Sequence, residues 1–580
     1  AGIATIKLNM KPGKRYISRH RNNTKDAIEQ IFGHIHTNYF NPNKDKLSDT
    51  KWVKKNLPFA GELLLGHLRY GTHGLNSIES CHPFLRQNNW ISRNLVIAGN
   101  FNLTNVDEQF NKLVKLGQYP KEKPDTVTIL EKIGHFLDVE VEELYEKLKK
   151  KGLKNPEINP RIFDKVDVKK ILKKAAKGFD GGYVMCGMIG HGDAFVMRDP
   201  SGIRPAFYYK DDEVLVVASE RPAIQTTFDV HISKIKELPP AHAAIIKHDG
   251  NFSVEQFQEP KERKSCTFES IYFARGNDRD IYLERKQLGV ELADRVYDAL
   301  KGDLDNAVFS FIPNTAETSF YGLVKGLESK LNDIKIEEIK AEGKNISDER
   351  LKTILEKRVR VEKLILKDAK LRTFIADDSS RDELVSHAYD VTYGIVKNEV
   401  DTLVLLDDSI VRGTTLQKSI IRIAARLRPK KIVIVSAAPQ IRYPDCYGID
   451  MSKMGNFVAF KALHQLLKQD KKEHLMLEAY GRCKMEANLP VKQMKNQVAP
   501  LYDVYTQKEI SKQIAKIVKP ADVKCEVEVI YQTVEGVHLA CPNRGGDWYF
   551  SGDYPTPGGN RVVNRSFMNY MEGKGHKRGY

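Results

Sequence analysis

The sequence predicts two successive folds, a layered α+β sandwich in the N-terminal half and a parallel-sheet α/β domain after it. Residues 1–255 contain many short strand-like segments with a few helical ones between them. Residues 403–406 are apolar at every position, which is typical of a central strand buried on both faces of a parallel sheet. Apolar residues then recur at helical spacing, at Leu416, Ile420, Ile423 and Leu427. With 580 residues, the chain is long enough for two or more domains with sizeable cores.

The expected elements of the N-terminal half are short and separated by turn signals. Strands are expected over residues 61–69, 94–98, 182–188, 194–197, 214–218 and 243–246, and helices over 25–36, 125–154 and 168–176. The segment R-D-P-S-G-I-R-P at residues 198–205 is one of the turn signals. Strands mixed with helices in this way predict the layered sandwich.

The net charge of +16 raises the question of nucleic-acid binding. Much of the excess lies in lysine-rich helical runs such as residues 146–154 and in the tail 573–578, with no recognised nucleic-acid motif. We interpret these runs as solvated faces with some attraction for polyanionic substrates, and expect no nucleic-acid partner. No apolar stretch approaches the length of a membrane span, and the seven cysteines show no disulfide rhythm. We therefore expect no membrane association and a cytoplasmic location.

The segment most informative about chemistry is residues 403–415, L-V-L-L-D-D-S-I-V-R-G-T-T. The apolar strand ends at two adjacent carboxylates, Asp407 and Asp408, and a turn rich in hydroxyls leads into the helix. Backbone N–H groups and hydroxyls of the turn can bind a phosphate, helped by the helix dipole; they belong to Ser409, Gly413, Thr414 and Thr415. The aspartates suit a ribose diol or a Mg²⁺ ion bridging a pyrophosphate. An ordinary turn with solvated aspartates is the alternative, which we would prefer for the Asp-Asp pair alone but not for the full run.

This run resembles the phosphoribosyl-pyrophosphate (PRPP) loop of the type I phosphoribosyltransferases. Together with residues 437–450, A-A-P-Q-I-R-Y-P-D-C-Y-G-I-D, it resembles the glutamine amidophosphoribosyltransferase family. The resemblance implies that PRPP is bound by Asp407, Asp408, Ser409, Val411, Arg412, Gly413, Thr414 and Thr415. It also implies Mg²⁺ as a cofactor, held by Asp407, Asp408 and Thr315, which follows a buried strand expected at residues 307–312.

Two further segments of this half are compared with the same family. R-T-F-I at residues 372–375 resembles the mobile loop that closes over PRPP and excludes water, so that ammonia attacks instead; Arg372 is its catalytic candidate. Residues 323–370 are rich in lysine and glutamate at helical spacing and are longer than the family core requires. We expect an inserted, solvated helical pair there, with a basic binding site as the less favoured alternative.

The N-terminal half resembles the N-terminal-nucleophile (Ntn) glutaminase domain of the same family. In G-H-L-R-Y-G-T-H-G at residues 66–74, the resemblance implies that Arg69 binds the glutamine carboxylate; an exposed strand-end arginine explains the residue type equally well. In L-V-I-A-G-N-F-N-L-T-N at residues 95–105, the Asn100 side chain and the Phe101 backbone N–H would form the oxyanion hole. At two positions of this segment the sequence departs from the family, with Gly99 in place of a histidine and Phe101 in place of a glycine. The resemblance also implies that Asp125 binds the amino group of the substrate.

The nucleophile of the family is an N-terminal cysteine whose own amine is the base. These residues begin Ala1-Gly2-Ile3 and contain no Arg-Gly-Gln, although the family carries that motif just before an alanine-glycine-isoleucine strand. We expect the chain to begin inside the domain, so that the cysteine is absent from it and not mutated. The residues as printed are then expected to use ammonia only.

A metal site is a further implication of the resemblance, because some members hold a four-iron cluster with four cysteines. Cys266, Cys446 and Cys541 fall near three of those positions, and His538 stands near the fourth. Such a set can bind zinc or an iron-sulfur cluster. Buried cysteines without a ligand are the alternative, and we favour it.

The resemblance implies three regions. They are a class II glutamine amidotransferase domain at residues 1–258 without its cysteine strand, a phosphoribosyltransferase domain at 265–470, and a C-terminal helical extension and tail at 471–580. The implied enzyme is a pentosyltransferase that makes 5-phosphoribosylamine, glutamate and pyrophosphate from PRPP, glutamine and water, the first committed step of purine synthesis. A homo-oligomer is expected. The alternatives are a PRPP-binding regulatory homologue without glutaminase activity and a basic nucleic-acid-binding protein that borrowed the fold.

Overall fold

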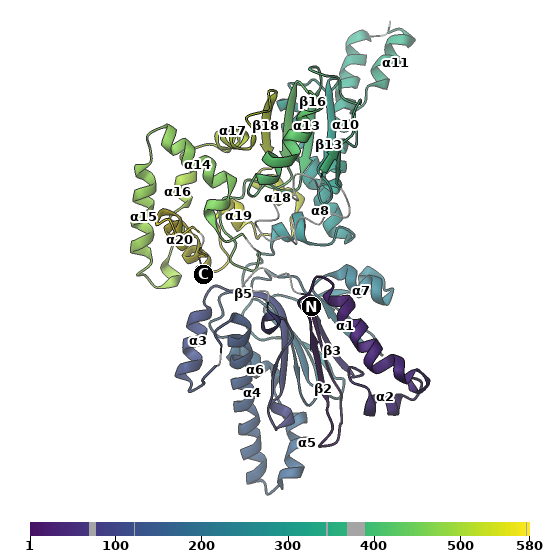
Figure 1. Cartoon of the computed structure of the whole chain (residues 1–580), viewed down its shortest axis with the longest axis vertical. Coiled ribbons are helices and arrows are strands. Elements are labelled where there is room, and N and C mark those ends of the chain that lie inside the picture. Colours follow the sequence, from purple (N-terminus) through teal and green to yellow (C-terminus); the bar gives the residue numbers. More distant parts are fainter. Residues whose placement is uncertain are drawn as a thin grey trace. The chain divides into compact units, whose positions relative to one another are not determined.

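The computed structural model describes residues 1–68, 77–120, 122–343, 346–367, 389–449, 451–575 and 577–579. The chain divides into two compact units (Figure 1). The first unit consists of Ala1–Ser265 and the short segment Asp445–Asp450. The second consists of Cys266–Pro444 and Met451–Gly579.

The first unit is built on antiparallel sheets. A six-stranded sheet has the order β12-β11-β7-β6-β5-β4, with bounds β4 Phe84–Arg86, β5 Leu95–Leu103, β6 Gly181–Ile189, β7 Ala194–Arg198, β11 His242–Ile246 and β12 Phe252–Gln256. Two three-stranded sheets have the orders β2-β1-β3 (Ile17–Arg21, Gly2–Ile6, Leu63–His67) and β10-β8-β9 (Lys236–Glu237, Phe207–Lys210, Leu215–Ala218). The expected strands are therefore present among the described residues.

Side chains alternate between the two faces of the six-stranded sheet, as the period of two in a strand requires. Leu95 and Ile97 of β5 lie in a core cluster with helices α4 (Asp125–Lys150), α5 (Asn155–Lys165) and α6 (Val168–Ala175). Val96 and Ala98, the alternate residues, pack with the β2-β1-β3 sheet. The unit is thus a helix layer, a large sheet and smaller sheets behind it, which confirms the predicted layered α+β sandwich. Its other helices are α1 (Ala27–Ile35), α2 (Thr50–Asn56), α3 (Val106–Lys115) and α7 (Arg221–Phe228).

The second unit has a parallel sheet in the order β13-β16-β17-β18. Its strands are Ala307–Phe311, Thr402–Asp407, Lys431–Ser436 and Glu526–Tyr531. One face, with Phe309, Val404 and Val433, packs on α9 (Ala293–Ala299) and α10 (Glu317–Glu342), while α13 (Ile421–Ala425) and α17 (Gln507–Val518) contact β17 and β18. This confirms the predicted parallel-sheet domain. Two helices precede β13, α8 (Arg279–Val290) and α9, separated at Glu291 and Leu292.

The C-terminal region, expected as a helical extension and tail at residues 471–580, also supplies a strand of the parallel sheet. It contains α15 (His474–Glu486), α16 (Ala499–Tyr502), α17, α18 (Val534–Ala540), α19 (Trp548–Ser551) and α20 (Pro557–Met571), preceded by α14 (Val458–Gln469). Between α17 and α18, the segment E-V-E-V-I-Y forms β18 and pairs in parallel with β17. Valine and isoleucine at a sheet edge explain the strand.

The helical pair expected at residues 323–370 is only partly an insertion. Leu323 and Leu327 of α10 are fully buried in the sheet core, because α10 begins at Glu317 and covers β13 before it extends away. Its distal part pairs with α11 (Asp348–Glu356), where Lys357 binds Glu338 at 2.6 Å. The chain then returns to β13 through a bridge at Val361 and to a small sheet of β14 (Ile365–Lys367) and β15 (Tyr389–Val391). Of the helices described, none is long and apolar enough to cross a membrane.

Candidate active site

The paired carboxylates lie where the strands of the parallel sheet end. Asp407 is the last residue of β16 and pairs with Ser436, the last residue of β17. Main-chain bonds hold the neighbouring turns at this edge: Ala437 N–H donates to the Asp407 carbonyl at 2.9 Å, and Ile312 N–H to the Leu406 carbonyl at 2.8 Å. Ligands of open parallel sheets bind outside this carboxyl edge.

The turn after Asp407 has a defined conformation. Asp408 N–H donates to Asp407 Oδ1 at 2.9 Å, and the Ser409 hydroxyl donates to Asp408 Oδ1 at 2.8 Å. The Val411 carbonyl accepts from the backbone N–H of Val458, at the start of α14, at 2.9 Å. Together, these bonds fix the side chains of the pair and tie the turn to its neighbouring helix.

A glycine is required at position 413, because the backbone has a positive φ and there is no room for a side chain. Its φ is +74°, and a Cβ there would lie 2.8 Å from Val518 Cγ1 of α17. Thr414 is half-buried and Thr415 exposed, and they begin a helical segment that runs through Leu416–Ile420 into α13. The N–H groups of a helix's first turn have no acceptor within the helix, so this turn presents donors suited to an anion.

The electrostatics of the carboxylate pair favour a bound cation. Burial, and then the charge of Asp408, raise the pKa of Asp407 well above its ordinary value. Burial also raises the pKa of Asp408, against the opposing effects of the Ser409 hydroxyl and of Arg285. Burial, and then both carboxylates, raise the pKa of Tyr389 to about 12. Two half-buried carboxylates that repel each other are stabilised when a cation joins them.

The sequence alone did not identify the basic residues near this pair. Arg285 of α8 is 4% exposed; its Nε donates to the Ser270 carbonyl and its Nη2 to the Ala274 carbonyl, both at 2.8 Å. Lys367 of β14 also opposes the rise in pKa of the two aspartates. Neither residue lies in a recognisable motif, and both are far from the pair in sequence. Thr315 lies half-buried in the turn between β13 and α10, and Arg372 lies outside the described residues.

A second group of predicted residues lies in the first unit. Asn100 is exposed on β5 and Phe101 follows it, half-buried. Asp125 is the first residue of α4, and its Oδ1 accepts from the N–H and the hydroxyl of Thr126 at 2.7 and 3.2 Å. His82 connects the two segments, with its ring 6.0 Å from that of Phe101 and Nε2 3.4 Å from the Thr126 hydroxyl. Arg69 lies outside the described residues.

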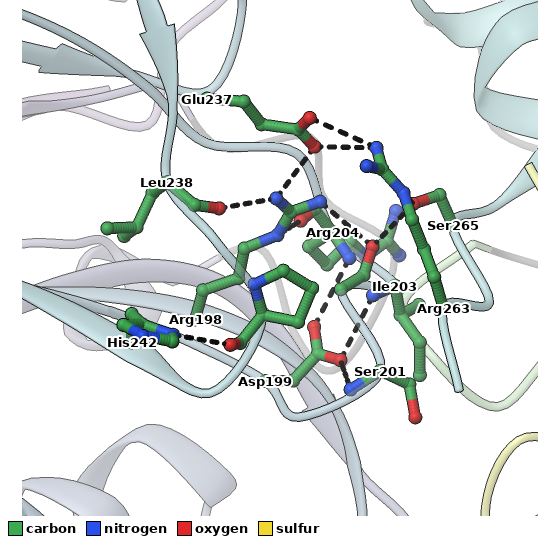
Figure 2. Close-up of polar contacts among 12 residues, drawn as sticks. Arg198, Asp199, Ser201, Ile203, Arg204, Glu237, Leu238, His242, Arg263 and Ser265 are labelled. Atoms are coloured by element: carbon green, nitrogen blue, oxygen red, sulfur yellow. Dashed lines mark hydrogen bonds and ion pairs between the residues drawn. The ribbon is translucent and has the colours of Figure 1, made fainter. Parts of the chain in front are cut away.

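The R-D-P-S-G-I-R-P segment forms a rigid framework, shown in Figure 2. Arg198 is 1% exposed and donates to the Arg204 and Leu238 carbonyls and to Glu237 at 2.6–2.7 Å. The Asp199 carboxylate accepts from the backbone N–H groups of Ser201 and Ile203, both at 3.0 Å, while burial raises its pKa. All these bonds lie within the loop or between it and its neighbours, so they account for its shape.

The same framework holds the segment 445–449 in the first unit. Arg204 Nε donates to the Tyr447 carbonyl at 2.9 Å, and Asn102 Nδ2 of β5 donates to the Cys446 carbonyl at 2.6 Å. Cys446 and Tyr447 are fully buried. Asn102 is two residues from Asn100, so this buried segment is packed against the strand that carries the oxyanion candidates.

The cysteines and histidine considered for a metal site do not form one in the part of the chain described, where no three His, Cys, Asp or Glu side chains are grouped to hold a metal. Cys266 Sγ lies 3.0 Å from the Tyr549 hydroxyl, and His538 pairs with Asp547 at 2.9 Å. Burial raises the pKa of the Cys541 thiol to about 12, which opposes a thiolate ligand.

Known proteins resemble the chain in both sequence and fold, although no model of a known protein family matches it. The amidophosphoribosyltransferase of Pasteurella multocida is 28% identical over 415 residues, covering 70% of this chain and 71% of that protein. The Escherichia coli amidophosphoribosyltransferase is 29% identical over 411 residues, covering 69% and 70%.

Solved structures extend the likeness to the whole fold. The glutamine PRPP amidotransferase of Bacillus subtilis, complexed with ADP and GMP, has a TM-score of 0.58 at 20% identity, covering 96% of this chain and 90% of its own. A structure of the allosteric regulatory enzyme of purine biosynthesis has a TM-score of 0.59 at 19% identity and the same coverage. By sequence over about 70% of its length and by fold over 96%, the chain is a relative of the amidophosphoribosyltransferases.

Proposed function

We propose that the protein is an amidophosphoribosyltransferase that replaces the pyrophosphate of PRPP with an amino group. The C1–O bond to pyrophosphate breaks, a C1–N bond to ammonia forms, and the nitrogen loses a proton, giving 5-phosphoribosylamine. Glutamine, hydrolysed to glutamate in the first unit, is the proposed source of that ammonia. The named relatives support this reaction class.

The observation that carries the proposal is the carboxylate pair followed by an anion-binding turn at the carboxyl edge of a parallel sheet. In the proposed complex, residues 409–415 bind the 5-phosphate, and Asp407 and Asp408 bind the ribose hydroxyls. The protein then contributes mainly by holding C1 and the nucleophile in line. Thr315, from the neighbouring strand end, lies on the pyrophosphate side.

The residues present fit a magnesium ion. Mg²⁺ is commonly held by one or two carboxylates together with substrate phosphates. The raised pKa values of Asp407 and Asp408 reflect burial and, for Asp407, the charge of Asp408, which Arg285 and Lys367 offset only in part. Asp407, Asp408 and Thr315 would hold the ion. When bound, Mg²⁺ would neutralise charge on the pyrophosphate as it leaves.

We propose the group around β5 and the start of α4 as the glutamine site. Asn100 and the Phe101 N–H would stabilise the oxyanion, and Asp125 and Arg69 would bind the amino and carboxylate ends of glutamine. Hydrogen bonds connect Asp125 to β5 by way of Thr126 and His82, which supports a single shared site.

Pyrophosphate release from PRPP with Mg²⁺ and ammonia tests the function of the second unit alone, without glutamine chemistry. Wild-type protein should release pyrophosphate in step with phosphoribosylamine formation. Asp407→Asn and Asp408→Asn should each lower the rate about 100-fold or more, the usual scale when preorganised charge is removed from a site.

Asp522→Asn is the matched control, because Asp522 is an exposed aspartate of the same unit that pairs with Arg422 at 3.3 Å. Its rate should equal that of wild type. Retention of full activity in both Asp407→Asn and Asp408→Asn would refute the proposed site. If neither the wild type nor the control forms phosphoribosylamine, the proposed reaction is refuted.

A further inference from the structure

The Gly99 peptide of β5 lies just beyond the end of the β4 ladder. Phe84, the first residue of β4, pairs with Ile97, so continued pairing would place His82 opposite Gly99. Strand β4 does not extend that far, and side chains take over from the main chain. Gly99 N–H donates to His82 Nδ1 at 3.3 Å, and His67 Nε2 lies 3.0 Å from the Gly99 carbonyl.

The two imidazoles form a compact support for this peptide. Their rings stack with centroids 4.2 Å apart and planes 18° apart, and His82 is 7% exposed. Gly99 cannot carry a side chain, because a Cβ would lie 2.5 Å from the Val184 carbonyl oxygen of β6. The two peptide groups that flank Gly99 therefore lie between β6 on one side and the histidines on the other, with His82 at the N–H and His67 at the carbonyl.

The direction of these bonds sets the tautomer of His82. Since Nδ1 accepts from Gly99, a neutral ring carries its proton on Nε2 and donates to the Thr126 hydroxyl at 3.4 Å. That hydroxyl in turn donates to Asp125 Oδ1 at 3.2 Å. A directed series of hydrogen bonds thus joins the strand of the oxyanion candidates to the carboxylate proposed to bind the substrate amine.

We propose that His82 is a positioning residue of the glutamine site, setting the spacing between the Gly99–Phe101 strand and Asp125. This rests on the proposed glutamine site. Glutamine must reach both segments at once, with its amide carbonyl at Asn100 and its amino group at Asp125. A bridge between the two segments determines whether one molecule can reach both.

Two substitutions of His82 each keep one of its two hydrogen bonds, the one to Gly99 or the one to Thr126. His82→Asn keeps an acceptor near the position of Nδ1, while His82→Gln places an amide donor near the position of Nε2. His82→Phe keeps only the ring that stacks on His67. Thr126→Val removes the hydroxyl and leaves His82 in place, and Thr126→Ser restores it.

Calorimetric titration of L-glutamine into the full chain, with thermal unfolding of each variant, tests the inference. His82→Phe and Thr126→Val should each weaken glutamine binding about tenfold or more, as expected for losing directed hydrogen bonds in a site. His82→Asn and His82→Gln should each recover part of the affinity, and Thr126→Ser most of it. His36→Asn and His36→Gln, at an exposed histidine after α1, should bind as wild type does.

The possible failures are distinguishable. If wild type binds glutamine and His82→Phe binds it equally well, His82 has no positioning role, while the proposed function stands. If His82→Phe does not fold, the Thr126→Val and Thr126→Ser pair decides by the same criterion. If wild type binds no glutamine, both the glutamine site and this inference are overturned, whereas PRPP turnover with ammonia still tests the second unit independently.

Discussion

The two candidate sites of this chain are assembled in different ways. In the second unit, one continuous segment supplies the strand end, both carboxylates, the turn and the helix start. In the first unit, β3, β5, α4 and the segment just before β4 each supply one or two groups, joined through His67 and His82. A contiguous site depends on local backbone geometry, whereas an assembled site depends on the framework that holds distant segments together.

The largest expected effect concerns the framework of the first unit. Arg198→Met leaves Glu237 and three backbone carbonyls without their buried donor, so it should destabilise that unit by about 3–5 kcal/mol, the usual cost of breaking a buried pair. Hydrogen exchange of the β6 and β7 peptides measures the loss. PRPP binding in the second unit should be unchanged at a temperature where the first unit stays folded.

Arg263→Met is the matched control, because Arg263 contacts the same Glu237 carboxylate at 2.8 Å while its side chain is 45% exposed. It should cost about 0–1 kcal/mol, as exposed ion pairs do. Equal losses in the two variants would show that burial of Arg198 is not what makes the framework rigid.

The next effect concerns local backbone geometry in the second unit. Gly413→Ala places a Cβ 2.8 Å from Val518 at a φ of +74°, so the turn must shift. PRPP affinity should fall about tenfold, the loss expected when one phosphate hydrogen bond of a charged ligand is misplaced. Titration calorimetry with PRPP and Mg²⁺ measures this.

Gly250→Ala serves as its control, since Gly250 has a φ of +88° and a Cβ there would meet nothing within 4 Å. Both variants carry the cost of a left-handed residue, which is about 1–2 kcal/mol for an alanine. Only Gly413→Ala should weaken PRPP binding. An equal loss in both would mean that the backbone conformation of the turn is not the cause.

The smallest expected effect is on how the stability of the folded protein depends on pH. The raised pKa of Asp408 means that the folded protein binds this proton more tightly than the unfolded chain does. Stability therefore falls as the pH rises from the ordinary aspartate pKa through the folded value, and the full penalty remains above it. Without Mg²⁺ or PRPP, Asp408→Asn should be about 1 kcal/mol more stable than wild type at pH 8. This is less than the full rise of the Asp408 pKa to about 6 would give, because water screens the charge of a half-buried carboxylate.

Thermal unfolding from pH 4 to pH 8 measures that difference, which should shrink as the pH approaches 4. Asp522→Asn should show no such trend. A variant that is less stable than wild type at pH 8 would mean that the carboxylate pair is already neutralised by groups around it.

What could be predicted from the sequence follows from this difference between the sites. The structure of residues 403–415 could be predicted because the apolar run, the carboxylates, the glycine and the helix are adjacent in the chain. A strand was likewise expected at residues 94–98, but its place between two layers was not. The start of β18 after a helical region, and the burial of Leu323 in the sheet core, could not be predicted because each depends on a partner strand far away in sequence.

The residues that support the two sites could not be predicted from the sequence for the same reason. His82 reaches Gly99 and Thr126 only after β4, β5 and α4 have packed, and Arg285 comes near Asp408 from a separate helix. No local pattern marks either one. The roles of Arg69 and Arg372, the restriction to ammonia, the homo-oligomer and the cytoplasmic location stay predictions.

The most direct test of two separate sites is a pair of titrations on wild type and on the Asp407→Asn/Asp408→Asn double variant. The account predicts that the double variant loses binding of PRPP with Mg²⁺ but binds L-glutamine with wild-type affinity. Unchanged PRPP binding in the double variant, or loss of glutamine binding together with PRPP binding, would contradict it.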